Sequence, residues 1–327
     1  MTDIRWGILA PGNIAHSFTQ DLRTAGLDVA AVGSRRLDAA RAFAAEFDIP
    51  NAYGSYEELV ADPDVDIVYV ASPHSHHRDQ AILALEAGKH VLIEKAVTLD
   101  AAEAAEIREA ARRRGLLAME AMWTRYLPHM IRIRELIAEG AIGDVRTLFA
   151  DHTQSLPTDP GHRLNALELG GGALLDLGIY PVSFAVDILG HVADTRATGR
   201  LSETGADTEV AISLAHDGGA VSSLVTSSRA QGPNVAHILG TDGRIEIDRV
   251  WYTPTSFRLI GRDGAVALDY RSEVEGRGMQ FQALYAEDLI RAGRTDSDLL
   301  PFDESIAIMA VLDDIRAQVG VVYPSAR

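Results

Sequence analysis

Residues 4–121 alternate short apolar runs with helical patterns, and this alternation constrains the fold more than any other feature of the chain. The apolar run at 4–9 ends in a turn of small residues, and a helical pattern starts after it. Further apolar runs follow at 29–33, 65–71 and 90–95, each separated from the next by a helix. Strands that alternate with helices predict a parallel sheet, with ligands bound at the carboxyl ends of its strands.

The first turn, Ala10-Pro11-Gly12-Asn13-Ile14-Ala15, resembles the G-x-G-x-x-G/A sequence that opens a dinucleotide-binding βαβ unit. Ala10 stands at the first glycine position, Gly12 at the second and Ala15 at the third. The pyrophosphate would lie at the N-terminus of the following helix, where unpaired N–H groups favour an anion. We therefore expect a Rossmann-type domain.

The second run ends in Ser34-Arg35-Arg36, where an NAD-binding protein would carry a carboxylate for the adenosine ribose. A hydroxyl and two guanidinium groups could instead hold a 2′-phosphate. This favours NADP over NAD, although NAD stays possible. The alternative is that both arginines are surface charges at the start of the next helix.

The third run leads into Ser72-Pro73-His74-Ser75-His76-His77. Three close histidines suggest a metal, but the sequence has no cysteine and no second cluster at a suitable spacing, so we expect none. The loop position at the end of a parallel strand favours ligand binding instead.

The fourth run ends in Glu94-Lys95. A lysine at the carboxyl end of a central strand is well placed for chemistry, because partial burial lowers its pKa and its charge favours the ionised form of an acidic neighbour. The alternative is a surface lysine that extends its ammonium group into water.

The pattern changes at Glu120-Ala121-Met122-Trp123-Thr124-Arg125. From residue 143 onward, period-two strands with glycine-containing turns predict one large, mostly antiparallel sheet. We therefore expect an α/β chain with a Rossmann domain at 1–122 and an α+β domain at 123–327, whose C-terminal helix could pack on the first domain.

Within that second part, Gly170-Gly171-Gly172 precedes an apolar run that contains Asp176 and Tyr180. Side chains four residues apart share one face of a helix, and glycines allow a close backbone approach. The stretch therefore presents a carboxylate and a phenol together. Alternatively, it is a turn followed by a core helix with an incidental tyrosine.

Composition limits the possible partners. The 327 residues carry a net charge of −17, which argues against nucleic acid and anionic membranes. No cysteine is present, no secretory signal is recognised, and we expect no apolar run to reach membrane-spanning length. We expect a soluble cytoplasmic protein.

Three segments, 7–15, Glu94-Lys95-Ala96 and 170–180, together resemble the glucose–fructose oxidoreductase/inositol dehydrogenase (Gfo/Idh/MocA) family over essentially the whole chain. Within it, 120–125 and 171–180 are most similar to the branch of dimeric trans-dihydrodiol dehydrogenases and NADP-dependent D-xylose dehydrogenases. The resemblance implies hydride transfer at a nicotinamide, a catalytic Lys95, an Asp176–Tyr180 pair, and a homodimer or higher homo-oligomer formed through the open sheet. Ala10 and Ala96 depart from the family motifs, which have glycine and proline there.

The resulting hypothesis is an NADP-dependent dehydrogenase or reductase for a sugar, polyol or cyclic diol. Tyr180 would remove the hydroxyl proton, Lys95 would favour its phenolate, and Asp176 would orient the pair or the substrate, with the substrate carbinol between the nicotinamide and the second domain. The expected cofactor contacts are Ala10, Gly12, Asn13, Ile14, Ser34, Arg35, Arg36, Ser72, Pro73, His74, His77, Glu94, Lys95, Ala121, Trp123 and Arg125. The expected substrate contacts are Lys95, Trp123, Asp176, Tyr180, Trp251 and Phe281, with core packing an open alternative for the aromatic residues and Arg125. A non-catalytic NADP-binding regulator and a scaffold protein of the same fold also remain open.

Overall fold

A computed structural model describes residues 4–324. The chain divides into two compact units. Unit 1 comprises Met1–Trp123 and Glu275–Ala307, and unit 2 comprises Thr124–Val274 and Ile308–Arg327. Residues 275–307 thus belong to unit 1, whereas the division expected from the sequence, 1–122 and 123–327, places them in the second domain.

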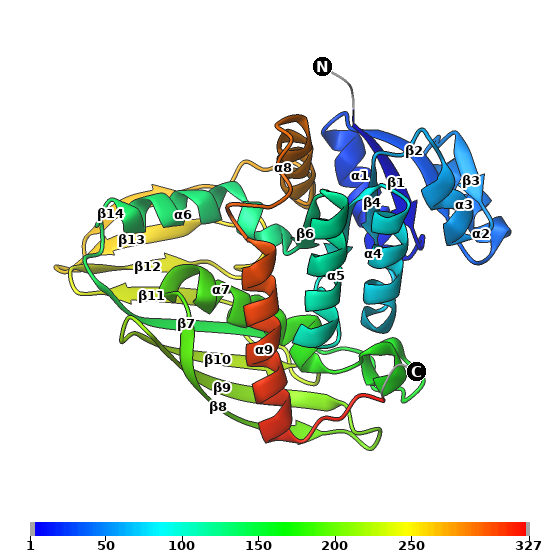
Figure 1. Cartoon of the computed structure of the whole chain (residues 1–327). Coiled ribbons are helices and arrows are strands. Elements are labelled where there is room, and N and C mark those ends of the chain that lie inside the picture. Colours follow the sequence, from blue (N-terminus) through cyan, green and yellow to red (C-terminus); the bar gives the residue numbers. More distant parts are fainter. Residues whose placement is uncertain (1–3, 325–327) are drawn as a thin grey trace. The chain divides into compact units, whose positions relative to one another are not determined.

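Unit 1 is built on a six-stranded parallel sheet with the strand order β3-β2-β1-β4-β5-β6. Its strands are β1 (Arg5–Leu9), β2 (Asp28–Gly33), β3 (Asn51–Tyr53), β4 (Ile67–Val70), β5 (His90–Glu94) and β6 (Ala118–Ala121). Its helices are α1 (Asn13–Thr24), α2 (Leu37–Glu46), α3 (Tyr56–Ala61), α4 (His77–Glu86), α5 (Ala101–Arg114) and α8 (Gln280–Arg291) (Figure 1). The strand order reverses between β1 and β4, which is where such sheets bind dinucleotides. The predicted Rossmann architecture is confirmed.

A buried hydrogen bond explains why α8 belongs to unit 1. The indole Nε1 of Trp6 in β1 donates to Glu287 Oε1 of α8 at 2.9 Å, and neither side chain is exposed to any appreciable extent. A buried donor and a buried carboxylate each need a partner, so this pair ties the returning segment to the first strand.

Unit 2 is built on an eight-stranded sheet with the order β14-β13-β12-β11-β7-β10-β9-β8. Only the β7–β10 pair is parallel. The strands are β7 (Val145–Thr153), β8 (Val192–Leu201), β9 (Asp207–His216), β10 (Val221–Ser227), β11 (Ala236–Gly240), β12 (Gly243–Ile247), β13 (Phe257–Gly261) and β14 (Val266–Tyr270). The helices α6 (Pro128–Ala138) and α7 (Ile179–Leu189) lie over one face of this sheet (Figure 1). α9 (Phe302–Val319) begins in unit 1 and ends in unit 2.

Burial alternates along the central strands of unit 2. In β10, Leu224 and Thr226 are buried, whereas Val221 and Val225 are almost half exposed. Successive side chains of a strand point to opposite faces, so one face of the sheet packs against the core and the other faces outward. The predicted, mostly antiparallel open sheet is confirmed.

One segment, Leu167–Leu189, is long and apolar enough to cross a membrane by length and composition, contrary to the expectation that no run is. In the structure 83% of its most apolar window is buried within the protein. The apolar residues of this segment therefore form part of the core of unit 2.

Candidate active site

The turn after β1 leaves a helix N-terminus open to an anion. Gly12 precedes α1 in an extended conformation, no side chain caps the helix, and its first turn contains no acidic residue. A Cβ added to Gly12 would meet no atom within 4 Å. The first N–H groups of α1, which begins with Asn13 and Ile14, are thus available to a phosphate. Ala10, the residue in place of glycine, has a φ of +70° and donates its N–H to Gly33 O at 3.1 Å.

The end of β2 presents two exposed arginines. Ser34 is buried, and its Oγ accepts the backbone N–H of Arg36 at 3.2 Å. Arg35 and Arg36 are exposed, and Arg35 lies close enough to Tyr56 to lower the pKa of that phenol, although burial has the larger effect and raises it overall. No carboxylate occupies residues 33–36. This end of the strand therefore suits a phosphate better than a bare ribose.

The loop after β4 is tied to the loop that carries Lys95. His74 Nε2 lies 3.2 Å from Lys95 O, and His77 Nδ1 lies 3.0 Å from Ala96 O. His77 Nε2 lies 2.8 Å from Ser72 O, which links the start of the same loop. Burial lowers the pKa of His77 to about 4, so its ring is neutral near pH 7. These two histidines act as structural ties, and no group of three or more metal-ligating side chains occurs among residues 4–324.

Glu94 is buried immediately before Lys95. It accepts a hydrogen bond from the Tyr69 hydroxyl and a second, at 3.3 Å, from the backbone N–H of Lys95. Burial raises the pKa of Glu94, while Lys95 and Arg277 oppose that rise. The peptide bond between Lys95 and Ala96 is cis. The hydrogen bonds of Glu94, His74 and His77 fix the backbone at Lys95 and Ala96. Lys95 itself is partly exposed and borders solvent.

Trp123 and Arg277 form a further pair in unit 1. The Arg277 guanidinium lies 5.4 Å from the centre of the Trp123 ring, a cation–π geometry. Asp21 holds the Arg277 backbone by accepting its N–H at 3.0 Å. Ala121 and Trp123 are buried, whereas Phe281 on α8 is partly exposed.

In unit 2, the helix that carries Asp176 and Tyr180 starts as a π-helix, Leu174–Gly178, which runs directly into α7. The sequence pattern indicated only an ordinary helix, because it does not show a one-residue widening of a turn. Such widened turns often occur at functional sites. Asp176 lies on the π-helix, mostly buried, and Arg163 Nη1 donates to its Oδ1 at 3.2 Å.

Tyr180, at the start of α7, lies in an aromatic cluster with His152 of β7 and Tyr252. The His152 ring stacks on Tyr252 with 3.8 Å between centres and meets Tyr180 edge-on at 4.9 Å. Tyr180 is only 7% exposed, so the residue is packed on several sides. Gln154 Nε2 lies 2.9 Å from His152 Nε2, which makes that ring nitrogen an acceptor.

Two of the predicted contact residues have structural partners of their own. Arg125 is buried, donates to Asp187 Oδ1 at 3.1 Å, and donates to Ser183 O at 2.9 Å. Trp251 is fully buried and donates its indole N–H to Asp151 O at 2.8 Å. Core packing accounts for both residues.

Sequence reasoning did not find several residues that contact the predicted ones. Tyr69 and Arg277 stand beside Glu94, His152 and Tyr252 surround Tyr180, and Arg163 pairs with Asp176. Each comes from a distant part of the sequence, so no local spacing could have indicated it.

The switch in strand order beside an uncapped helix N-terminus defines unit 1 as a dinucleotide-binding domain of the Rossmann type. Family comparison agrees. Residues 4–122 match the model described as "Oxidoreductase family, NAD-binding Rossmann fold", and residues 130–246 match the GFO/IDH/MocA C-terminal domain. The chain belongs to the Gfo/Idh/MocA family of NAD(P)-binding oxidoreductases, as its motifs predicted.

Relatives cover nearly the whole chain. Trans-1,2-dihydrobenzene-1,2-diol dehydrogenase of Mus musculus is 38% identical, and that of Homo sapiens is 36% identical, each over 98% of both chains. An aldose-aldose oxidoreductase from Caulobacter crescentus, complexed with glycerol, superposes with a TM-score of 0.87 at 25% identity, over 98% of both chains. A 3-ketoreductase from Actinomadura kijaniata, in complex with NADP and TDP-benzene, gives 0.85 at 27% identity, over 97% of this chain and 98% of that one.

Proposed function

We propose that this oxidoreductase uses NADP to oxidise a secondary carbinol of a sugar or cyclic diol, or to reduce the corresponding carbonyl. The observation that carries the proposal is the position of Asp176 and Tyr180 on one continuous helical segment, the π-helix and the start of α7, with Tyr180 held in an aromatic cluster. Aromatic faces suit six-membered rings, and a carboxylate suits vicinal hydroxyls. The names of the relatives, a diol dehydrogenase and sugar oxidoreductases, support the same substrate class.

In the oxidation direction, the Tyr180 oxygen takes the proton of the substrate hydroxyl as the C–H bond breaks. A bound nicotinamide would supply the hydride acceptor, so that the carbinol would lose two electrons and become a carbonyl. A phenol is a weak base at its ordinary pKa near 10, so proton removal needs a cation that favours its ionised form, the role that the family resemblance implies for Lys95. Asp176 orients the substrate hydroxyls, while Arg163 holds its carboxylate in place. Glu94 and the two histidines fix the backbone that presents Lys95.

The test is NADPH formation by the purified protein over a panel of aldopyranoses, inositols and trans-dihydrodiols. Tyr180→Phe should lower kcat by about 100-fold or more, the range typical of a lost general base, and leave the Kd of NADPH within about twofold. Tyr270→Phe, a remote tyrosine on β14, is the matched control. Equal losses of turnover and NADPH binding in Tyr180→Phe would refute the catalytic assignment.

The same panel separates the enzyme from its alternative, a non-catalytic NADP-binding regulator. A regulator would bind NADPH without turning over any substrate on the panel. Lys95 and Tyr180 favour the enzyme, because binding a dinucleotide requires neither a proton-transfer residue nor its activating cation.

The preference for NADP is supported by the two exposed arginines after β2. Arg36→Ala should weaken NADPH binding by roughly 10- to 100-fold, because a charge-assisted hydrogen bond contributes about 1.5–3 kcal/mol, and should leave NADH binding almost unchanged. Arg41→Ala, an exposed arginine on the same helix, controls for net charge. A preference for NADP that survives replacement of both Arg35 and Arg36 would contradict this assignment.

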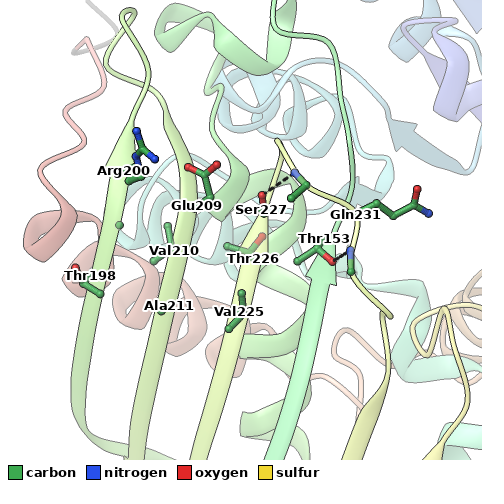
Figure 2. A pocket seen from close by; sticks show the side chains of 13 residues that line it. Thr153, Thr198, Arg200, Glu209, Val210, Ala211, Val225, Thr226, Ser227 and Gln231 are labelled. Atoms are coloured by element: carbon green, nitrogen blue, oxygen red, sulfur yellow. Dashed lines mark hydrogen bonds between the residues drawn. The ribbon is translucent and has the colours of Figure 1, made fainter.

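We further propose that the outward face of the unit 2 sheet binds a second copy of the chain. Phe149, Val221 and Val225 are each more than 40% exposed on the neighbouring strands β7 and β10. Figure 2 shows Val225 with Ala211 and Thr198 on adjacent strands, where they line a cavity of about 440 Å³. An exposed apolar surface of this kind is typical of an interface.

The oligomer proposal is tested by light scattering coupled to size-exclusion chromatography. Val225→Glu should convert the expected dimer to a monomer, because it introduces a charge into the apolar face. Val266→Glu, on the edge strand β14, is the control for an exposed valine elsewhere on the sheet. A wild-type protein that is monomeric at micromolar concentration would refute the proposal.

A further inference from the structure

A buried carboxylate, distant in sequence, caps the helix that carries Asp176 and Tyr180. Asp207, the first residue of β9, is 2% exposed, and its Oδ2 accepts the backbone N–H of Leu174 at 2.6 Å. Leu174 begins the π-helix that continues into α7. The first N–H groups of a helix have no acceptor within it, and a negative charge there is favourable. Asp207 therefore acts as an N-terminal cap supplied from 33 residues further along the chain.

The glycine turn before the helix is shaped around this carboxylate. Gly172 has a φ of +138°, and a Cβ added there would lie 2.2 Å from Asp207 Oδ1, so only glycine allows this approach. The Tyr323 hydroxyl donates to the neighbouring Gly171 O at 3.1 Å. The guanidinium of Arg316 lies 4.8 Å from the centre of the Tyr323 ring. A carboxylate and a phenol thus hold one backbone turn from two sides.

Asp176 lies two residues after Leu174, and Tyr180 lies six residues after it, on an unbroken helical segment. We propose that Asp207 is a positioning residue, which sets the place of the Asp176 and Tyr180 side chains through the N–H of Leu174, with Tyr323 as a second tie. The inference rests on the proposed function of Tyr180. In this proposal Asp207 acts on the site through its hydrogen bond to the helix backbone and does not contact the substrate.

The strength of the cap depends on charge. Burial raises the pKa of Asp207 to about 6, although hydrogen bonds from the N–H groups of Leu174 and Ala173 and the nearby Arg316 oppose that rise. The other ionisable groups at this place are Tyr323 and, beside it, Asp313. A protonated carboxyl group is a weaker acceptor and carries no charge for the helix N-terminus. The hold on the helix should therefore weaken as pH falls through about 6.

The experiment compares Asp207→Ala, Asp207→Asn and Tyr323→Phe with the wild type. At pH 8, Asp207→Ala should lower kcat by about 10- to 100-fold, the effect of a small misplacement of a reacting group, with the KM for NADP within about twofold. Asp207→Asn keeps an acceptor without the charge, so its kcat should match that of the wild type at pH 5 and should lack the wild-type rise near pH 6. Tyr323→Phe, which leaves the buried charge in place, should lower kcat by about two- to tenfold, and it provides the test if Asp207→Ala does not fold.

Amide hydrogen exchange gives a readout that does not need turnover. Exchange at residues 174–180 should accelerate by about tenfold in Asp207→Ala, because the first turn of the helix loses its cap. The control is Asp100→Ala, which removes the cap of α5, where Asp100 Oδ1 accepts the N–H of Glu103 at 2.9 Å, and should leave both kcat and exchange at 174–180 unchanged.

Unchanged exchange at 174–180 in Asp207→Ala would overturn the inference, as would a kcat within twofold of the wild type in both Asp207 variants. Accelerated exchange in a protein that turns over no substrate would support the positioning role, and it would count against the proposed function alone.

Discussion

Asp207 should make the free energy of unfolding fall as pH rises between about 4 and 6. Its pKa in the folded protein is about 6, raised by burial from an ordinary value of 3.8. Between these two values the folded state keeps a proton that the unfolded state has already released, so raising the pH favours unfolding. A pKa difference of about 2.2 corresponds to about 3 kcal/mol once the pH exceeds both values.

The perturbation that isolates this effect is Asp207→Asn, which has a similar shape and no titration. Linkage with these two pKa values gives about 2 kcal/mol of lost stability at pH 5 and about 3 kcal/mol at pH 7. The difference in stability between the variant and the wild type should therefore shift by about 1 kcal/mol in favour of the variant between these pH values. This comparison cancels the effects of the substitution that do not depend on pH. It also cancels the contributions of the other titrating groups, which both proteins share.

The assay is urea unfolding of both proteins at several values between pH 4.5 and 7.5, followed by circular dichroism and tryptophan fluorescence. Coincidence of the two signals checks that each unit contributes to one transition. If the difference in the free energy of unfolding between variant and wild type were constant with pH, the raised pKa of Asp207 in the folded protein would be refuted. A difference that grows in favour of the wild type as pH rises would show instead that its pKa lies below 3.8.

Two further pairs of substitutions test the energetic cost of a left-handed backbone and of an unpaired buried charge. Ala10→Gly should raise the free energy of unfolding by about 0.5–1 kcal/mol. It removes the cost of about 1–2 kcal/mol that alanine pays in a left-handed conformation, but the unfolded chain gains conformational entropy, which offsets part of this gain. Gly26→Ala, at a residue that also has a φ of +70° and open space around it, should lower the free energy of unfolding by a similar amount. If both changes moved stability in the same direction, the argument from φ would be wrong. Asp187→Ala should cost about 3–5 kcal/mol in urea unfolding, since it strands the buried Arg125, whereas Asp269→Ala at an exposed pair should cost less than about 1 kcal/mol. A loss below about 1 kcal/mol in Asp187→Ala would mean that water solvates that guanidinium.

The elements that could be predicted from the sequence are those with local signals. Helix α5 (Ala101–Arg114) is such an element, because Asp100 caps its start and Gly115 ends it with a φ of +64°. Seven of the eight strands of unit 2 were recognisable from their period-two apolar pattern and glycine turns, whereas β14 was not predicted. By contrast, the return of 275–307 to unit 1 depends on the pair Trp6–Glu287, which lies 281 residues apart in sequence. No local pattern contains such information.

The candidate site divides in the same way. Lys95 and Tyr180 could be named because they occupy recognisable motifs, and their catalytic roles stay predictions. The residues that hold them could not be named. Tyr69 reaches Glu94 through the pairing of adjacent strands, and His152 reaches Tyr180 by facing inward from β7. Such neighbours follow from strand order and register, which are set by the whole chain.

Asp207 shows why a positioning group of this kind can persist although it destabilises the fold. Its ionised form costs about 3 kcal/mol at neutral pH relative to a group that stays protonated, whereas an apolar or amide side chain would avoid that cost. The same ionised form is the stronger acceptor for the N–H of Leu174, at the start of the helix that carries Asp176 and Tyr180. If positioning is its role, Asp207→Asn must gain stability relative to the wild type as pH rises from 5 to 7 and must be less active than the wild type at pH 7. A variant that is both more stable and equally active would leave the buried charge without a function in this reaction.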